Sequence, residues 1–419
     1  MENIIRIKKR TIPYYIFIML VYIFLLRDPL EQCLPSFGVF DEILALMAIP
    51  ASLLVNRGKI SLHRKGICIG YWPFIFLVIL SGILGNLIYR YQPFFDAAMP
   101  DMFLFLKFWL WIEVGICLFK SFDMRQYSRK IFKHITFIAF LFLFLIIFDN
   151  LLHIFPAEVR YGLRSTQLFY FHPTSFASCM MFLMGILLLL RRSISSKEFY
   201  YCEILLSILA CSSFRSKIFG SVLLMWLIIY FIFIRKRKIT MKTMLLFIPP
   251  VVFTAWEQIQ FYFFSDMAER GARLLLSINS IQIANSHFPI GAGFATFASY
   301  YSGVFYSPLY TMLGISNVQG ISPTDTSFIS DTFWPMVIGQ TGYVGLLCFV
   351  FAIYRVYKKI QITRKTSLEV YACGLFSVLY LLIESTTAAA FVHPIYVSIA
   401  FLLAYVVAWS DNHYVREKV

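Results

Sequence analysis

Arginine and aspartate residues stand out in one polar stretch of this chain, from Phe261 to Asp331, between strongly apolar segments. It includes Arg270, Arg273 and Asp325. A planar guanidinium donates paired hydrogen bonds that match the oxygens of a phosphate group. A carboxylate can accept the proton of an attacking hydroxyl group. The stretch therefore indicates chemistry on one side of a membrane.

The chain as a whole is too apolar for a soluble protein. Of its 419 residues, 59% are hydrophobic and only 14% are charged, and the mean hydropathy is +0.73. Apolar runs of roughly 18 residues recur along the sequence, which is the length of a membrane-spanning helix and not of a barrel strand. We therefore predict an all-α, polytopic bundle of transmembrane helices.

Hydropathy places twelve spans, an even number that leaves both termini on one side of the membrane. The spans lie at about 12–30, 38–55, 67–88, 102–119, 133–152, 172–190, 199–213, 217–234, 241–258, 332–353, 368–386 and 391–409. Three regions follow: a bundle over 1–258, a long loop over 259–331 and three spans over 332–419, all packed as one domain.

Most of the 37 basic residues fall in one alternate set of loops and in both termini. Lys and Arg near span ends are retained in the cytoplasm, so both termini are predicted to be cytoplasmic and the long loop extracytoplasmic. The same distribution explains the net charge of +15. Nucleic-acid binding is therefore not predicted.

A smaller set of basic residues lies on the opposite side, where the topology rule disfavours them. These candidates for binding a lipid-linked diphosphate are Arg160, Arg164, Arg215, Lys217, Arg270 and Arg273. Each one alone could instead reach lipid headgroups or pair with a carboxylate. As a set, they favour phosphate binding.

Two of these arginines lie in a predicted short helix of the long loop. Asp266 and Glu269 have the spacing of a capping box at its start. Arg270, Arg273 and Ser277 then share one face. An apolar face is predicted to lie on the bundle, formed by Leu274, Leu275, Ile278 and Ile281.

Motifs of metal and nucleotide chemistry are missing from the sequence. It has no D-x-D, no H-E-x-x-H, no Walker loop and no G-x-G-x-x-G. The segment "GAGFATF" is interpreted as a tight turn, and the external histidines are scattered along the chain. We predict neither a metal site nor a cofactor. No C-x-x-C occurs among the eight cysteines, and a disulfide framework is not predicted.

Four motifs in order carry a resemblance to a known family. They are "HPTSFA" after Arg164, "SSFRSKIFG", "RLLLSINSIQIANSHFPIGAGFATF" and "SDTFWPMVIGQTGYVGLL". Together they resemble the superfamily of O-antigen polymerases and O-antigen ligases, which are bacterial membrane glycosyltransferases. The resemblance covers roughly residues 160 to 350 and implies a GT-C-like fold.

The resemblance implies a donor glycan linked through diphosphate to undecaprenol. A hydroxyl of a second saccharide attacks it outside the inner membrane, without a metal, while arginines hold the diphosphate. Arg215 and Arg273 are then the first candidates for this clamp, followed by Arg164 and Arg270. A chain-length regulator and a flippase are possible partners.

The position of the general base separates the two branches of that superfamily. The ligase branch has a His-Asn pair shortly before the following span, where this chain has Asp331 and Thr332. We therefore favour the polymerase, with Asp331 as base and Asp325 as the alternative. Both carboxylates lie in segments with turn chemistry, so a cap or turn is the other interpretation.

Two further alternatives remain open. A flippase for lipid-linked oligosaccharides would also be a basic membrane protein of twelve spans, although such transporters are built from repeated halves. The aromatic segment "SYYSGVFYSPLY" could stack on sugar rings, and it could equally form an interfacial belt.

Overall fold

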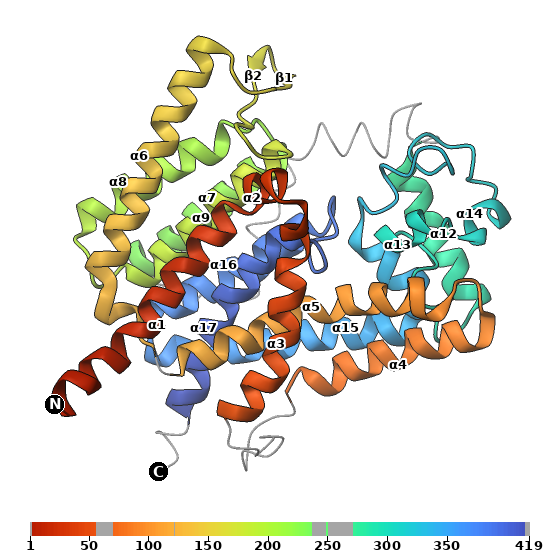
Figure 1. Ribbon diagram of the computed structural model, residues 1–419, viewed down its shortest axis with the longest axis horizontal. Helices are drawn as coiled ribbons and strands as arrows, with labels where there is room; N and C mark the ends of the chain where they lie inside the picture. Colours follow the sequence, from red (N-terminus) through yellow and green to blue (C-terminus); the bar gives the residue numbers. More distant parts are fainter. Residues whose placement is uncertain (1, 56–69, 121, 237–248, 250–270, 415–419) are drawn as a thin grey trace.

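The structure is a computed structural model that describes residues 2–55, 70–120, 122–236, 249 and 271–414. Most of these residues are helical, and the strands in the described part form one short hairpin. This confirms the prediction of an all-α protein. Figure 1 shows the helices arranged as a bundle.

The elements follow the chain in this order: α1 (Glu2–Leu25), α2 (Arg27–Cys33), η1 (Pro35–Val39), α3 (Phe40–Val55), α4 (Trp72–Tyr89), η2 (Phe94–Ala98), α5 (Met99–Phe119), η3 (Met124–Tyr127), α6 (Ser128–Leu152), β1 (Val159–Arg160), β2 (Leu163–Arg164), α7 (Pro173–Leu190), α8 (Ser196–Cys211), α9 (Ser216–Ile229), η4 (Tyr230–Ile234), α12 (Ala272–Ser286), α13 (Tyr300–Val304), α14 (Pro308–Met312), α15 (Phe333–Thr366), α16 (Leu368–Glu384), η7 (Pro394–Tyr396) and α17 (Val397–Tyr414).

Seven helices in the described residues are long and apolar enough to cross a membrane, and α1 with α2 forms one further candidate span bent by 69°. Three more predicted spans coincide with the shorter helices α3, α8 and α16, of 16, 16 and 17 residues. The predicted span 241–258 lies outside the described residues, except for position 249. The chain is thus a multi-pass membrane protein, and the number twelve stays a prediction.

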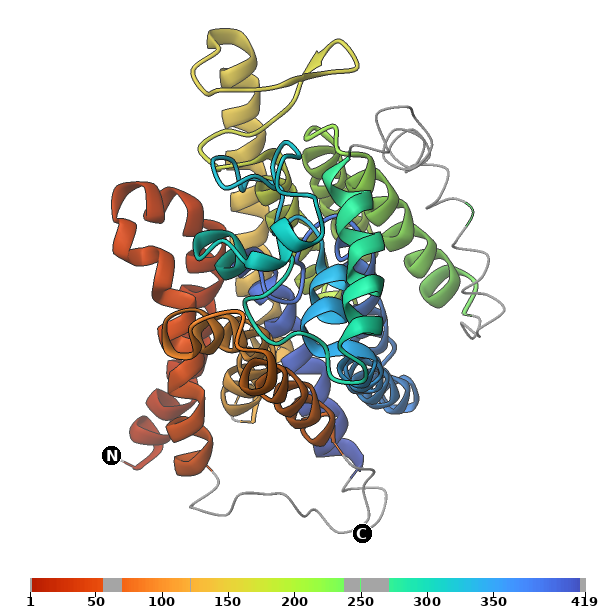
Figure 2. The same cartoon turned by 90° about the vertical axis from the view of Figure 1, so that its right-hand side faces the viewer.

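Helix α7 is the centre of the bundle, because every one of its residues is buried. It packs against α8, α16 and α17. The beginning of α1 and the end of α17 lie at one end of the bundle, and the hairpin β1–β2 lies at the other (Figure 2). The interior of the bundle is therefore built by helices that run between two polar ends.

The segment "GAGFATF" is buried inside the protein and does not lie on its surface. Asn86 of α4 binds it with both ends of its amide, which accepts from the Phe294 N–H and donates to the Phe294 carbonyl. Gly293 has a φ of 103°, and a side chain there would meet the backbone of Asn86 at 2.5 Å. Glycine is required at this turn because helix and loop touch through their backbones.

The prediction for the arginine-bearing helix is wrong in one respect. Helix α12 begins at Ala272 after the extended residue Gly271, and the predicted capping box of Asp266 and Glu269 lies outside the described residues. Its predicted apolar face is not the buried one, since Ile278 and Ile281 are about half exposed while Leu276 is buried. Hydropathy could not separate these faces, because apolar side chains of a membrane protein can face lipid as well as protein.

Candidate functional site

The first segment of the site is the hairpin β1–β2, which carries Arg160. Its two central residues, Tyr161 and Gly162, have φ values of 51° and 74°. Two positive φ values are required by the tight turn that suits the twist of a two-residue hairpin. Val159 pairs with Arg164, and Arg160 pairs with Leu163.

The hairpin is attached to the turn between α8 and α9. The Thr166 N–H donates to the carbonyl of Ser212 at 2.9 Å. The Ser165 hydroxyl donates to the carbonyl of Ser213 at 2.8 Å. Arg215 is the N-cap residue of α9 and comes directly after this turn. Two stretches distant in sequence thus bring their arginines together.

A cavity of about 310 Å³ opens at this end of the bundle. Its walls come from the hairpin, from the starts of α7, α9, α12 and α15, and from the loop between α16 and η7. Five residues singled out in the sequence line it: Arg160, Arg215, Lys217, Arg273 and Asp331. The structure therefore gathers four cations and one carboxylate from separate segments.

Arg215 and Arg160 share the carboxylate of Glu158. The nearest nitrogens of the two guanidiniums lie 3.0 Å and 3.2 Å from it. Partial burial raises the pKa of Glu158, but the charges and hydrogen bonds of these arginines outweigh it and lower the pKa below its ordinary value. The side chain of Arg215 is only 9% exposed, whereas that of Glu158 is 49% exposed. Glu158 therefore has room to leave when another anion enters.

Lys217 forms the most deeply buried ion pair of the cavity. Its ammonium lies 2.8 Å from the carboxylate of Glu384, a fully buried residue at the end of α16. The Tyr396 hydroxyl donates to the same oxygen at 2.5 Å. A charge withdrawn from water in this way must be paired. The pair therefore fixes Lys217 at the floor of the cavity.

Arg273 and Asp331 complete the charged wall. The guanidinium of Arg273, in the first turn of α12, donates to Asp331 Oδ2 at 2.9 Å. Asp331 precedes α15, whose N-cap residue is Thr332. Asp331 is therefore not the cap of that helix, and both side chains of the pair are partly exposed to the cavity, at 21% and 32%.

Two histidines face the same cavity from similar positions. His172 caps α7 and His393 caps η7, and each precedes a proline. In each ring, Nδ1 accepts a backbone N–H, from Thr174 at 3.1 Å and from Ile395 at 3.3 Å. In the neutral ring the proton is then on Nε2, the nitrogen that these bonds leave available.

The surroundings hold both rings neutral. Desolvation, followed by the charges of Arg215 and Lys217, lowers the pKa of His172 to about 4. Desolvation and cations that include Arg27 lower the pKa of His393 to about 3. Each imidazole is thus a neutral hydrogen-bond donor at neutral pH.

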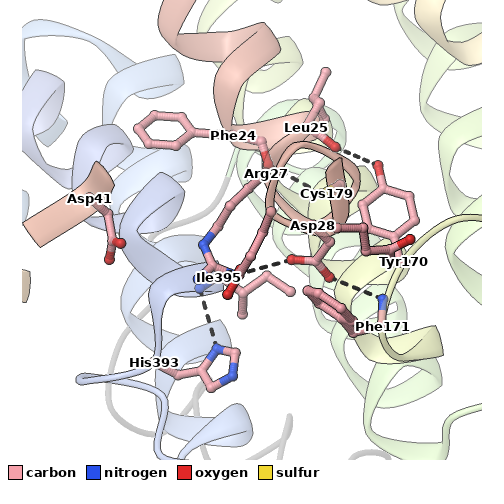
Figure 3. Close-up of polar contacts among 12 residues, drawn as sticks. Phe24, Leu25, Arg27, Asp28, Asp41, Tyr170, Phe171, Cys179, His393 and Ile395 are labelled. Atoms are coloured by element: carbon pink, nitrogen blue, oxygen red, sulfur yellow. Dashed lines mark hydrogen bonds and ion pairs between the residues drawn. The ribbon is translucent and has the colours of Figure 1, made fainter. Parts of the chain in front are cut away.

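The bend between α1 and α2 binds the two residues that precede His172. Tyr170 lies two residues before His172, and its hydroxyl donates to the carbonyl of Leu25 at 2.7 Å. Asp28, which is buried and paired with Arg27, accepts the N–H of Phe171 at 3.4 Å. Figure 3 shows Arg27 and Asp28 close to the loop that carries His393.

Two of the predicted site residues, Arg164 and Asp325, do not line this cavity. Arg164 binds Asp149 at the end of α6 and the carbonyl of Phe155, so it holds the loop after that helix. Asp325 accepts the N–H groups of Gly320 and Ser327 in a turn. These hydrogen bonds lower the pKa of Asp325. Arg270 lies outside the described residues.

The sequence did not predict that Glu158, Glu384 and the two histidines belong to one site. A carboxylate at the end of an otherwise apolar span, such as Glu384, is costly in a membrane and was a usable signal. The dipeptide His-Pro at the start of two spans, at His172 and His393, was another. Glu158 gave no signal, because a loop glutamate is ordinary.

The arrangement suits an anionic ligand with several oxygens better than a metal ion. Four cations and two neutral imidazoles surround the cavity. In the part of the chain that the structure describes, no three His, Cys, Asp or Glu side chains are grouped as metal ligands. The sequence matches no protein-family model and no curated protein.

Proposed function

We propose that this protein is a polysaccharide polymerase of the bacterial cytoplasmic (inner) membrane, a metal-independent glycosyltransferase with a GT-C-like fold. It transfers a growing glycan from undecaprenyl diphosphate to a lipid-linked repeat unit, at the outer face of the membrane. The observation that carries this proposal is the convergence of Arg160, Arg215, Lys217 and Arg273 on one cavity next to Asp331. Spaces between the helices of bundles are common ligand sites.

The cations serve the leaving group. As the bond between the anomeric carbon and the phosphate oxygen breaks, negative charge develops on the departing diphosphate. Lys217 is fixed by its buried carboxylate partner Glu384 before the substrate arrives, so this cation needs little reorganisation. The diphosphate displaces the exposed carboxylate of Glu158 from Arg215 and Arg160.

Asp331 serves the nucleophile. The acceptor hydroxyl gives its proton to this carboxylate, its oxygen bonds to the anomeric carbon, and the electron pair of the breaking bond leaves with the diphosphate. Arg273 holds Asp331 in position at 2.9 Å. The neutral Nε2–H groups of His172 and His393 donate to substrate oxygens without adding charge.

Deleting the gene in its host and resolving the surface and carrier-linked glycans by length tests the proposal. If the protein is a polymerase, the deletion strain carries single repeats on its surface and lacks the long chains. Long chains that stay on the carrier lipid would identify a ligase instead. Repeats trapped at the cytoplasmic face would identify a flippase and overturn the assignment as an enzyme.

A further inference from the structure

A second pocket adjoins the cationic cavity. It has a volume of about 260 Å³ and lies between α13 and the segment 326–330. Ser330 lines both this pocket and the cationic cavity. Asp331, the proposed base, is the next residue in the chain. The two spaces therefore meet where the transferred group must be.

The chemistry of this second pocket is the opposite of that of the first. It is lined by no charged side chain, only by hydroxyl, aromatic and small apolar ones. Among the residues described, the hydroxyls of Thr326 and Ser330 have no hydrogen-bond partner. Tyr300, which also lines the pocket, is 61% exposed. Unpartnered hydroxyls beside an exposed aromatic ring match the alternating polar and apolar faces of a sugar.

The walls of this pocket are fixed before any ligand binds. Ser299 caps α13 in a capping box with Ser302, whose hydroxyl also contacts that of Tyr310 at 2.7 Å. Gly303 faces Thr326 so closely that an added Cβ would meet the Thr326 Cβ at 3.2 Å. The pocket is therefore a preformed crevice and suits a rigid ring.

We propose that this pocket is a neutral saccharide subsite that holds the sugar next to the bond being made. The proposal rests on the function proposed above and adds a separate site to it. The cationic cavity takes the diphosphate, the neutral pocket takes a sugar ring, and Asp331 lies at their junction. The sugar comes from the donor or from the acceptor, which kinetics can distinguish.

The test uses the full-length protein in lipid nanodiscs with the lipid-linked repeat unit of its host. Val304 and Met312 are exposed apolar residues of α13 and α14, at 55% and 67%, and only Val304 lines the pocket. Val304→Trp fills the pocket and is expected to raise the KM for a lipid-linked substrate at least about tenfold. Met312→Trp is the matched control and leaves KM unchanged.

A milder variant removes a single hydroxyl from the pocket. It provides a valid test even if Val304→Trp does not fold. Thr326→Ala is expected to raise KM about fivefold through the loss of one hydrogen bond, with little change in kcat. A rise for the acceptor alone assigns the pocket to the attacking sugar, and a rise for the donor alone assigns it to the donor sugar. Unchanged KM values for both substrates in both variants would overturn the subsite.

A binding measurement separates this inference from the transferase proposal. The probe is the repeat-unit oligosaccharide after mild acid has released it from the carrier, so that it has no phosphate. Its binding is measured by saturation-transfer NMR. We expect binding to the wild type and to Arg215→Ala, and loss of binding in Val304→Trp. If the wild type transfers glycan but the probe binds Val304→Trp equally well, only the subsite fails. If the wild type transfers no glycan, the proposed function fails.

Discussion

Two cavities at opposite ends of the bundle have the same number of basic residues but differ in how these residues are held. One is the cationic cavity of about 310 Å³ described above. The other is larger, about 640 Å³, and is lined by Arg191, Arg192, Arg364 and Lys365. Helices α7 and α16 run from one cavity to the other. The 18 residues of α7 span about 27 Å. That length is close to the hydrocarbon thickness of a bilayer.

The cations of the larger cavity are two pairs of sequence neighbours at helix ends. Arg191 stacks over the rings of Phe199 and Tyr200, and the carboxylate of Glu369 accepts a hydrogen bond from Ser367. Such clusters at span ends are what retention in the cytoplasm requires. The predicted membrane topology accounts for the basic residues of this cavity without a ligand.

The cations of the smaller cavity come from three distant segments and are bound to carboxylates at 2.8–3.2 Å. No topology rule places them there. The number of positive charges therefore does not identify a site in this protein. Convergence from separate segments and pairing with acidic partners does.

The largest expected effect is the loss of polymer on removal of the central arginine. Arg215→Ala is expected to lower the rate of transfer about 10³-fold, because one preorganised donor to the departing charge is missing. Glycan length in a complemented deletion strain is the measurement, with the amount of protein in the membrane fraction as a check on insertion. Arg192→Ala in the larger cavity is the matched control and keeps normal chains. Normal chains in Arg215→Ala would contradict the clamp.

The two candidate bases are separated by a pair of isosteric changes. Asp331→Asn is expected to lower kcat about 10²-fold, since the acceptor hydroxyl loses its proton acceptor. Asp325→Asn, in the turn outside the cavity, is expected to leave kcat unchanged. Steady-state kinetics on purified protein measure both. The opposite order of effects would place the base in the turn.

Breaking the buried ion pair is expected to destabilise the protein strongly. Lys217→Met leaves the fully buried carboxylate of Glu384 uncompensated and is expected to lower the free energy of unfolding by about 3 kcal/mol. Thermal unfolding in detergent measures it. Combining Lys217→Met with Glu384→Gln should restore much of the loss, because the stranded charge is gone.

A more exposed ion pair at the other end of the bundle is the control for the buried pair of Lys217 and Glu384. Lys359 and Asp411 form an ion pair whose side chains are 20% and 30% exposed. Lys359→Met is expected to change the free energy of unfolding by less than about 1 kcal/mol, since water can solvate the remaining carboxylate. Equal losses at the two ends would show that burial of Glu384 does not matter.

The smallest expected effect concerns pH. The native protein keeps His172 neutral down to about pH 4, whereas the unfolded side chain takes up a proton near its ordinary value of 6.5. The unfolded state then binds more protons in this window, so stability falls as pH falls from 6.5 toward 4. His172→Asn keeps a capping side chain and removes this titration. Its unfolding temperature should depend less on pH between about 6.5 and 5 than that of the wild type. An identical pH dependence in the variant would contradict the assignment of His172 as a neutral donor.

Hydropathy alone indicated the class of this protein and the positions of its long apolar helices. The apolar runs are long enough that their burial or insertion outweighs any local preference, and so α4 to α7, for example, coincide with predicted spans. The unusual arginines on one side were also visible in the sequence. Five of the eight candidate residues, four cations and Asp331, line one cavity.

Which charges meet depends on how the helices pack in three dimensions. Arg164 and Arg160 are close in sequence, yet Arg164 binds Asp149 while Arg160 reaches the cavity, because the hairpin turns its two strands to different neighbours. Glu384 and Lys217 meet across helices that are far apart in the chain. Pairing is set by the packing of helices against one another, and that depends on distances between faces which hydropathy does not contain.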